Sequence, residues 1–134
     1  MSSNQSPLNL PFKRLRQLRK GLLNLHKNLL ESERITYEKC YGRIPSKGEF
    51  FRLVIGDDWF SWLRPFSQFI VKIDETLEEK EPVTLDQVNE LLEEAKFLLR
   101  VDEQGTEREK RYYQAIQRDP NIAFIHAEVS NIFK

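Results

Sequence analysis

The sequence predicts an all-α helical bundle, and three observations lead to that fold class. Leucines and other apolar residues recur at spacings of three and four along most of the chain, as on the buried face of a helix. Helix-capping patterns and prolines separate these runs. No segment alternates apolar and polar residues as a strand does. We therefore expect three long and two to three shorter helices, packed as antiparallel neighbours.

The first long segment, residues 11–41, carries the clearest helical pattern. At 100° per residue its leucines lie within one narrow stripe. Gly42 and Pro45 then end the segment, because both residues disfavour continuation of a helix. Residues 1–10 are polar and punctuated by proline, and we expect a disordered tail there. Residues 11–134 form a single domain, in keeping with a length of 134 residues. The leucines of the stripe are Leu15, Leu18, Leu22, Leu25 and Leu29.

Polar caps predict where the remaining helices begin. A short helix is expected over residues 49–55, and longer ones over 59–80 and 85–100. Two shorter helices are expected over 106–118 and from 120 onward. Their caps are Ser46 with Glu49, Asp57 or Asp58, Thr84 with Gln87, Thr106 with Glu109, and Asp119 followed by Pro120.

The third segment, residues 59–80, combines a dense aromatic face with an internal proline. Pro65 removes a backbone donor and clashes with the preceding turn, so a kink or break is predicted near residues 61–64. Phe60 and Val71 fall off the apolar stripe of this segment. These two side chains are candidates for a second contact surface, and with it a dimer interface or a ligand cleft.

The charges are balanced overall but separated along the chain. Lys plus Arg and Asp plus Glu are both 21, which disfavours a strongly basic nucleic-acid-binding protein. Residues 1–30 hold six Lys or Arg and no acid, whereas residues 74–94 hold nine acids and one Lys. The basic stretch is a candidate contact for phosphate or an anionic surface, although such runs more often form a solvated face or complement an acidic segment. Its candidate residues are Lys13, Arg14, Arg16, Arg19 and Lys20.

Titratable side chains gather on the apolar faces of the predicted helices. His26 lies on the first leucine stripe, and Glu33 and Tyr37 continue the same face. Asp74 falls at the edge of the third segment's stripe, and His126 lies on the last apolar face. Acid–base enzymes hold carboxyl groups in such buried settings, so these five residues are a candidate polar cluster.

The same polar residues have a structural interpretation, a hydrogen-bond network between helices. In that case we expect Glu33 or Asp74 to pair with an arginine. The arginines considered for this pairing are Arg34, Arg43 and Arg64.

The spacing of possible ligands predicts no metal and no cofactor. Neither histidine has the Glu-x-x-His or His-x-x-x-His spacing that metal-binding helices use. The lone cysteine, Cys40, is expected to be a small buried thiol in a reducing compartment. No apolar run is long enough to cross a membrane, and the first residues do not resemble a secretory signal. These features predict a cytoplasmic protein.

Three stretches carry a resemblance. They are residues 25–38, from Leu25-His26-Lys27 to Tyr37-Glu38; the run WFSWLRP at 59–65 leading to IDE at 73–75; and QRDP at 117–120 with His126-Ala127. Together they resemble a family of small, uncharacterised bacterial helical proteins over most of residues 22–130. The resemblance implies a bacterial, cytoplasmic and helical protein. It brings no assigned activity, so no functional residue is carried over from it.

These observations predict a non-enzymatic protein that binds or interacts with other proteins, including a second copy of itself through a helix face. The alternative is a small-molecule or cofactor-binding bundle, enzymes included, that uses the candidate polar cluster. A third hypothesis is contact between the basic stretch and phosphate or an anionic surface. Nucleic acid has little support as a partner, because only Phe12 interleaves these cations.

Overall fold

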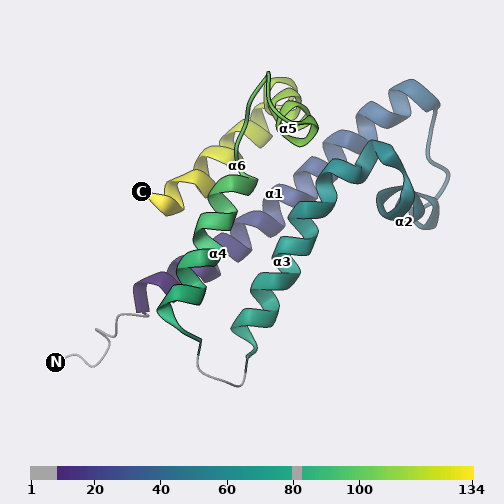
Figure 1. Cartoon of the computed structure of the whole chain (residues 1–134). Coiled ribbons are helices and arrows are strands. Elements are labelled where there is room, and N and C mark those ends of the chain that lie inside the picture. Colours follow the sequence, from purple (N-terminus) through teal and green to yellow (C-terminus); the bar gives the residue numbers. More distant parts are fainter. Residues whose placement is uncertain (1–8, 80–82) are drawn as a thin grey trace.

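The computed structural model describes residues 9–79 and 83–134, and every regular element in these ranges is a helix (Figure 1). The predicted all-α bundle is confirmed. The six α-helices in these ranges are α1 (Asn9–Tyr41), α2 (Lys47–Gly56), α3 (Arg64–Leu77), α4 (Leu85–Leu98), α5 (Glu107–Arg118) and α6 (Pro120–Ser130). The 3-10 helix η1 (Asp58–Leu63) connects α2 to α3, and a second one, η2 (Asn131–Phe133), follows α6.

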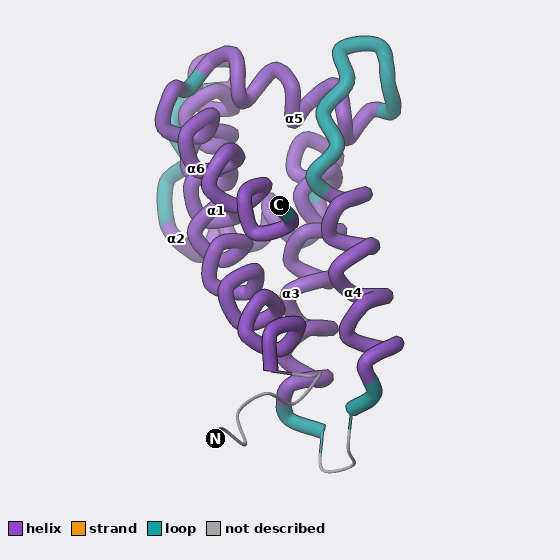
Figure 2. The backbone as a smooth tube through the Cα atoms, turned by 90° about the vertical axis from the view of Figure 1, so that its left-hand side faces the viewer, coloured by secondary structure: helices purple, strands orange, loops and turns teal. Residues whose placement is uncertain are grey.

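Helix α1 is the element around which the others pack. Its leucine stripe is fully buried, and α3, α4, α5, α6 and η1 all contact it. Arg19 pairs with Asp74 near one end of α3, and Glu33 bonds Trp62 just before the other. The earlier residue of α1 thus contacts the later residue of the third segment, and the later residue of α1 contacts the earlier one. Helices α1 and α3 are therefore antiparallel. Figure 2 shows α3 and α4 side by side, and Lys72 joins them by pairing with Glu94 at 2.8 Å.

Helices α1 and α6 approach closely at a glycine. A Cβ atom built on Gly21 would lie 2.9 Å from Cγ2 of Val129, which is too short for ordinary contact. The absent side chain therefore sets the distance between the two helices. Further along, the amide Nδ2 of Asn121 donates to Oδ1 of Asn28 at 2.9 Å.

The helix starts follow the predicted caps. Thr84 and Thr106 each form a complete capping box, with Gln87 and Glu109 respectively. Ser46, Asp57 and Asp119 also accept backbone N–H bonds, at the starts of α2, η1 and α6. At the other end of α1, Gly42 has a positive φ of 91°, a conformation that glycine adopts without strain.

The third segment breaks where the proline predicts, but its first part is not α-helical. Residues 58–63 form the 3-10 helix η1, and α3 begins at Arg64 with Pro65 in its first turn. The ring of Pro65 would clash with a preceding α-helical turn, whereas the first turn of a helix accommodates it. The Arg64 guanidinium holds this junction by donating to the backbone oxygen of Asp57 at 3.0 Å.

Four details differ from the sequence-based expectations. Helix α1 begins at Asn9, inside the expected tail, whose residues 1–8 lie outside the described part.

Phe60 is fully buried because the 3-10 geometry turns it inward, so it cannot belong to a second contact surface; Val71 is exposed. Cys40 is exposed rather than buried, because η1 contacts this end of α1 on the side of Tyr37 and Tyr41, whose rings pack against Trp59. Helix α3 ends at Leu77, and Lys80, the expected end, lies outside the described residues.

Candidate functional site

A buried carboxylate on α1, that of Glu33, lies at the centre of the candidate site. Its side chain is 1% exposed, and its two oxygens accept from Arg111 Nη2 and Arg118 Nη2, each at 2.6 Å. The indole Nε1 of Trp62 donates to the Oε1 of Glu33 at 3.2 Å. Arg118 also donates from Nε to the hydroxyl of Ser32 at 3.0 Å. We call these five residues the Glu33 network; it joins α1, η1 and α5.

Aromatic rings make the buried charge of Arg111 tolerable. Its guanidinium carbon lies 5.1 Å from the ring centre of Trp59 and 5.9 Å from that of Trp62. The same guanidinium donates to the backbone oxygen of Trp59 at 3.1 Å. Ring faces attract cations, and this attraction offsets part of the hydration that Arg111 loses. The side chain of Arg111 is accordingly only 20% exposed.

The bonding of Glu33 limits what its carboxylate can do chemically. A general base must present an oxygen to the proton it removes. Both oxygens of Glu33 already accept charge-assisted bonds from guanidinium groups. Proton transfer to Glu33 would therefore break an ion pair between α1 and α5. The arrangement is that of a structural link between these two helices.

A second buried polar pair joins α5 to α6. Tyr112 is fully buried, and its hydroxyl lies 2.6 Å from Nδ1 of His126. Burial raises the pKa of Tyr112 and lowers the pKa of His126, so both groups are neutral near pH 7. The neutral pair is satisfied when the hydroxyl donates to Nδ1 and the imidazole carries its hydrogen on Nε2.

The structure does not bring the candidate polar cluster together. Glu33 binds α5, Asp74 pairs with Arg19, and His126 bonds Tyr112. Arg19 and Glu33 are separated by fourteen residues of α1, or about 21 Å at 1.5 Å per residue. The antiparallel packing of α3 thus places Asp74 far from Glu33, and the prediction of one acid cluster is wrong.

The two remaining members of the cluster lie in apolar surroundings. The ring of Tyr37 packs edge-on against Trp59 at 5.6 Å between ring centres, and tilted against Tyr41 at 4.8 Å. His26 is half-buried on α1, and burial lowers its pKa. Within residues 9–79 and 83–134, no side-chain hydrogen bond reaches His26. Neither residue touches the Glu33 carboxylate.

The predicted arginine partners are also wrong, although the prediction of a network between helices is right in kind. Arg34 binds Glu31 and Glu38 on its own helix, and its hydrogen bond to Glu31 raises the pKa of the guanidinium. Arg64 binds backbone oxygens, and Arg43 is exposed. The partners of Glu33 come from α5, and the partner of Asp74 is Arg19 of α1; all three arginines are distant in the sequence from the acid that they bind.

One sequence signal could have indicated Arg111 and Arg118. They are seven residues apart, which places them on one side of α5. That side borders the apolar face formed by Tyr112 and Ala115. Arginines at the edge of a buried face need acceptors on a neighbouring helix, and Glu33 is an acid on the continuation of the leucine stripe.

The basic residues of α1 divide into two groups. Arg19 pairs with Asp74, and Arg14 is half-buried. Lys13, Arg16 and Lys20 are exposed on the outer face of α1. The charges that remain available to a partner are therefore fewer than the sequence suggests.

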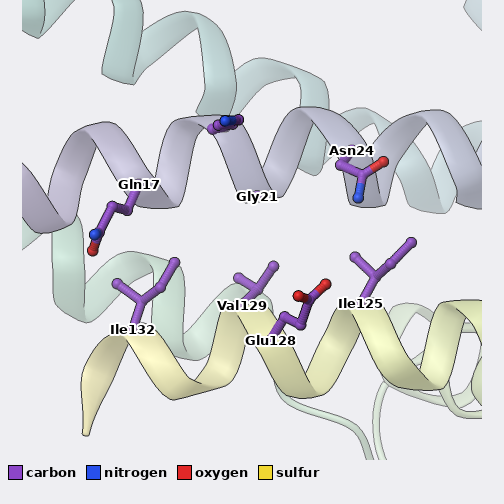
Figure 3. Close-up of a pocket in the computed structure, with 8 residues that line it drawn as sticks. Gln17, Gly21, Asn24, Ile125, Glu128, Val129 and Ile132 are labelled. Atoms are coloured by element: carbon purple, nitrogen blue, oxygen red, sulfur yellow. The ribbon is translucent and has the colours of Figure 1, made fainter.

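Several open clefts lie on the surface of the described part, and the residues that line them do not include members of the Glu33 network. The most apolar is a groove of about 480 Å³ between α1 and α6, which Figure 3 shows in close-up. Ile125 and Val129 reach up from α6 and Ile132 from η2, and Gly21 faces them from α1. In residues 9–79 and 83–134, no three His, Cys, Asp or Glu side chains are grouped to hold a metal ion.

Comparisons with known proteins assign no function to this site. The chain matches no family profile, no curated protein and no solved structure. None of the helices in residues 9–79 and 83–134 has both the length and the apolar character needed to cross a bilayer. The family resemblance therefore stays a prediction.

Proposed function

We propose that this protein is a non-enzymatic interaction module that binds other protein surfaces through the outer faces of its helices. The observation that carries the proposal is the internal pairing of its reactive groups. Both oxygens of Glu33 are occupied, Tyr112 bonds His126, and Asp74 pairs with Arg19. A chemical role for any of them would require breaking a bond that holds two helices together.

The outer surface supports the same proposal. Several large apolar side chains are exposed although the core beneath them is filled; Phe51 is 65% exposed, Phe124 is 63% and Phe97 is 56%. Protein interfaces are enriched in aromatic residues, which supply contact area at a low cost in conformational entropy. The guanidinium groups of Arg100 and Arg108 lie over the ring of Phe97, as cations do beside an aromatic contact residue at an interface.

The alternative function is small-molecule binding, and the groove between α1 and α6 favours it. Its volume of about 480 Å³ falls within the range of ligand sites. Lys20 and Glu128 at its rim could orient a polar group, and Ile125 and Val129 offer an apolar floor. The residues that line this groove include none of the five members of the candidate polar cluster.

Two measurements on the same protein separate these functions. Cross-linking in the cells of origin, followed by purification, should recover the chain attached to a protein, a second copy of itself included. Native mass spectrometry, an absorbance scan and metal analysis of the purified protein should show the bare polypeptide mass. A stoichiometric small molecule or metal that is lost in Tyr112→Phe or Gly21→Leu would overturn the proposal, as would the absence of any cross-linked protein.

A further inference from the structure

The outer face of α1 presents a row of cations that the rest of the bundle leaves exposed. We call Lys13, Arg16, Lys20 and Lys27 the α1 basic stripe; all four are exposed, and none forms an ion pair within residues 9–79 and 83–134. Three of them recur every seven residues, which repeats about every 10.5 Å along the helix. Leu23, 42% exposed, lies between the last two lysines.

The outer face of α4 presents the opposite charge. We call Asp86, Glu90 and Glu93 the α4 acidic stripe; these exposed residues follow one another at spacings of four and three. Asp86 and Glu90 form no ion pair in the described part of the chain, and Glu93 pairs with Lys96 of its own helix. Phe97 continues the stripe by one more turn and is 56% exposed.

The two stripes face away from each other in one molecule. Helix α4 packs on the buried side of α1, and the basic stripe occupies the opposite side. Figure 2 shows α1 and α4 towards opposite edges of the bundle. One molecule therefore cannot neutralise its own stripes, whereas two molecules can.

We propose that the α1 basic stripe binds the α4 acidic stripe of a second copy of this chain. The inference rests on the proposed function and names the partner. Both stripes repeat their charges every two helical turns and both carry an exposed apolar residue, so their charges and apolar contacts are complementary. The contact is head-to-tail, which leaves one stripe free at each end of a pair and allows further copies to add. A formal net charge of zero removes the overall repulsion that would oppose it.

Carboxylates of the same molecule reduce what the neighbouring cations of the α1 basic stripe contribute to binding. Asp74 and Glu78 line a cleft beside Arg16 and Lys20, and Asp74 pairs with Arg19. These carboxylates weaken the positive field along one edge of the stripe. A contact formed by a few solvent-exposed charges is weak and salt-dependent. We therefore expect association at high protein concentration and low salt.

The test is a charge-reversal complementation. One variant carries Lys13→Glu, Lys20→Glu and Lys27→Glu; the other carries Asp86→Lys, Glu90→Lys and Glu93→Lys. Light scattering and sedimentation velocity at about 20 mM salt should show association of the wild-type chain, weakened at least about tenfold near 0.3 M salt. Each variant alone should stay monomeric, and an equimolar mixture should associate again, because each interface then joins opposite charges.

A matched control separates this contact from general charge repulsion. Lys39→Glu, Lys47→Glu and Lys110→Glu change the net charge equally but alter exposed residues outside both stripes. This variant should associate more strongly than the first reversal variant, and circular dichroism should show all variants folded. A monomeric wild-type chain at every concentration, or no recovery in the mixture, would overturn the inference. Cross-linking to a different protein in cells would then leave the proposed function standing.

Discussion

Replacing Glu33 with glutamine removes one buried negative charge and leaves its two guanidinium partners in place. Arg111 and Arg118 would then face an amide, whose NH₂ group cannot accept from either of them. Breaking a buried ion pair by removing one partner costs about 3–5 kcal/mol. The side chains of Arg111 and Arg118 are 20% and 33% exposed, so water can hydrate part of each unpaired charge. The cost should therefore lie at the lower end of this energy range. We expect a loss of about 3 kcal/mol in the free energy of unfolding.

Thermal and urea unfolding, followed by circular dichroism, measure this loss. For a chain of this length the entropy of unfolding converts about 3 kcal/mol into a fall of about 10 °C in Tm. Glu94→Gln is the matched control, since it makes the same chemical change in the exposed pair with Lys72 and should cost under about 1 kcal/mol. Equal midpoints for Glu33→Gln, Glu94→Gln and wild type would refute the view that the Glu33 network holds α1 to α5.

Three further predictions follow from packing, capping and titration. Gly21→Ala should destabilise the protein by about 1–2 kcal/mol because the new methyl group meets Val129, and Val129→Ala in the same chain should recover part of that loss in urea unfolding. Thr106→Ala should lower stability by about 1 kcal/mol in the same assay because it removes one side of a capping box. Burial lowers the pKa of His26 and His126, so the unfolded chain binds protons more readily; Tm should fall as the pH drops from above to below 6.5, and replacing His126 with glutamine should reduce that fall.

Periodicity predicts most of the fold because burial of a continuous apolar stripe dominates helix formation. The stripe from Leu15 to Leu29 is buried throughout, and the capping residues mark the helix starts to within two residues. Pro65 correctly predicts the break before α3. It does not predict the 3-10 form of η1, because the position of a proline indicates where a helix breaks and not which geometry precedes the break.

The candidate site is less predictable because periodicity gives the face of a helix and not its neighbour. Glu33 could be assigned to a buried face from its place after the leucine stripe. Its partners lie 78 and 85 residues later, and only the position of α5 against α1 brings them close. The same periodicity puts Asp74 and His126 on or beside inward faces, yet Asp74 faces Arg19 of α1 and His126 faces Tyr112 of α5. Their grouping into one cluster therefore had no physical basis in the sequence.

The Glu33 network fixes position as well as stability. A leucine stripe repeats every three or four residues, so a helix packed on it could shift by one turn with modest loss of contact. A carboxylate bound by two guanidinium groups and an indole N–H has no equivalent one turn away. Such buried polar groups can determine which packing a protein adopts even when apolar residues would stabilise it equally.

Replacing the charges with apolar residues separates these two effects. The triple variant Glu33→Leu, Arg111→Met, Arg118→Met leaves no unpaired charge, so it should recover part of the stability that Glu33→Gln loses. The rest is not recovered because the indole N–H of Trp62 has no acceptor in this variant, at a cost of about 1–3 kcal/mol. Its helices α5 and α6 should nevertheless lose their fixed register on α1. Amide hydrogen exchange would then be faster in residues 107–130 than in wild type, while the amides of α1 and α3 stay protected. Wild-type exchange rates across α5 and α6 in this variant would show that apolar packing alone sets the register, and that the network contributes energy only.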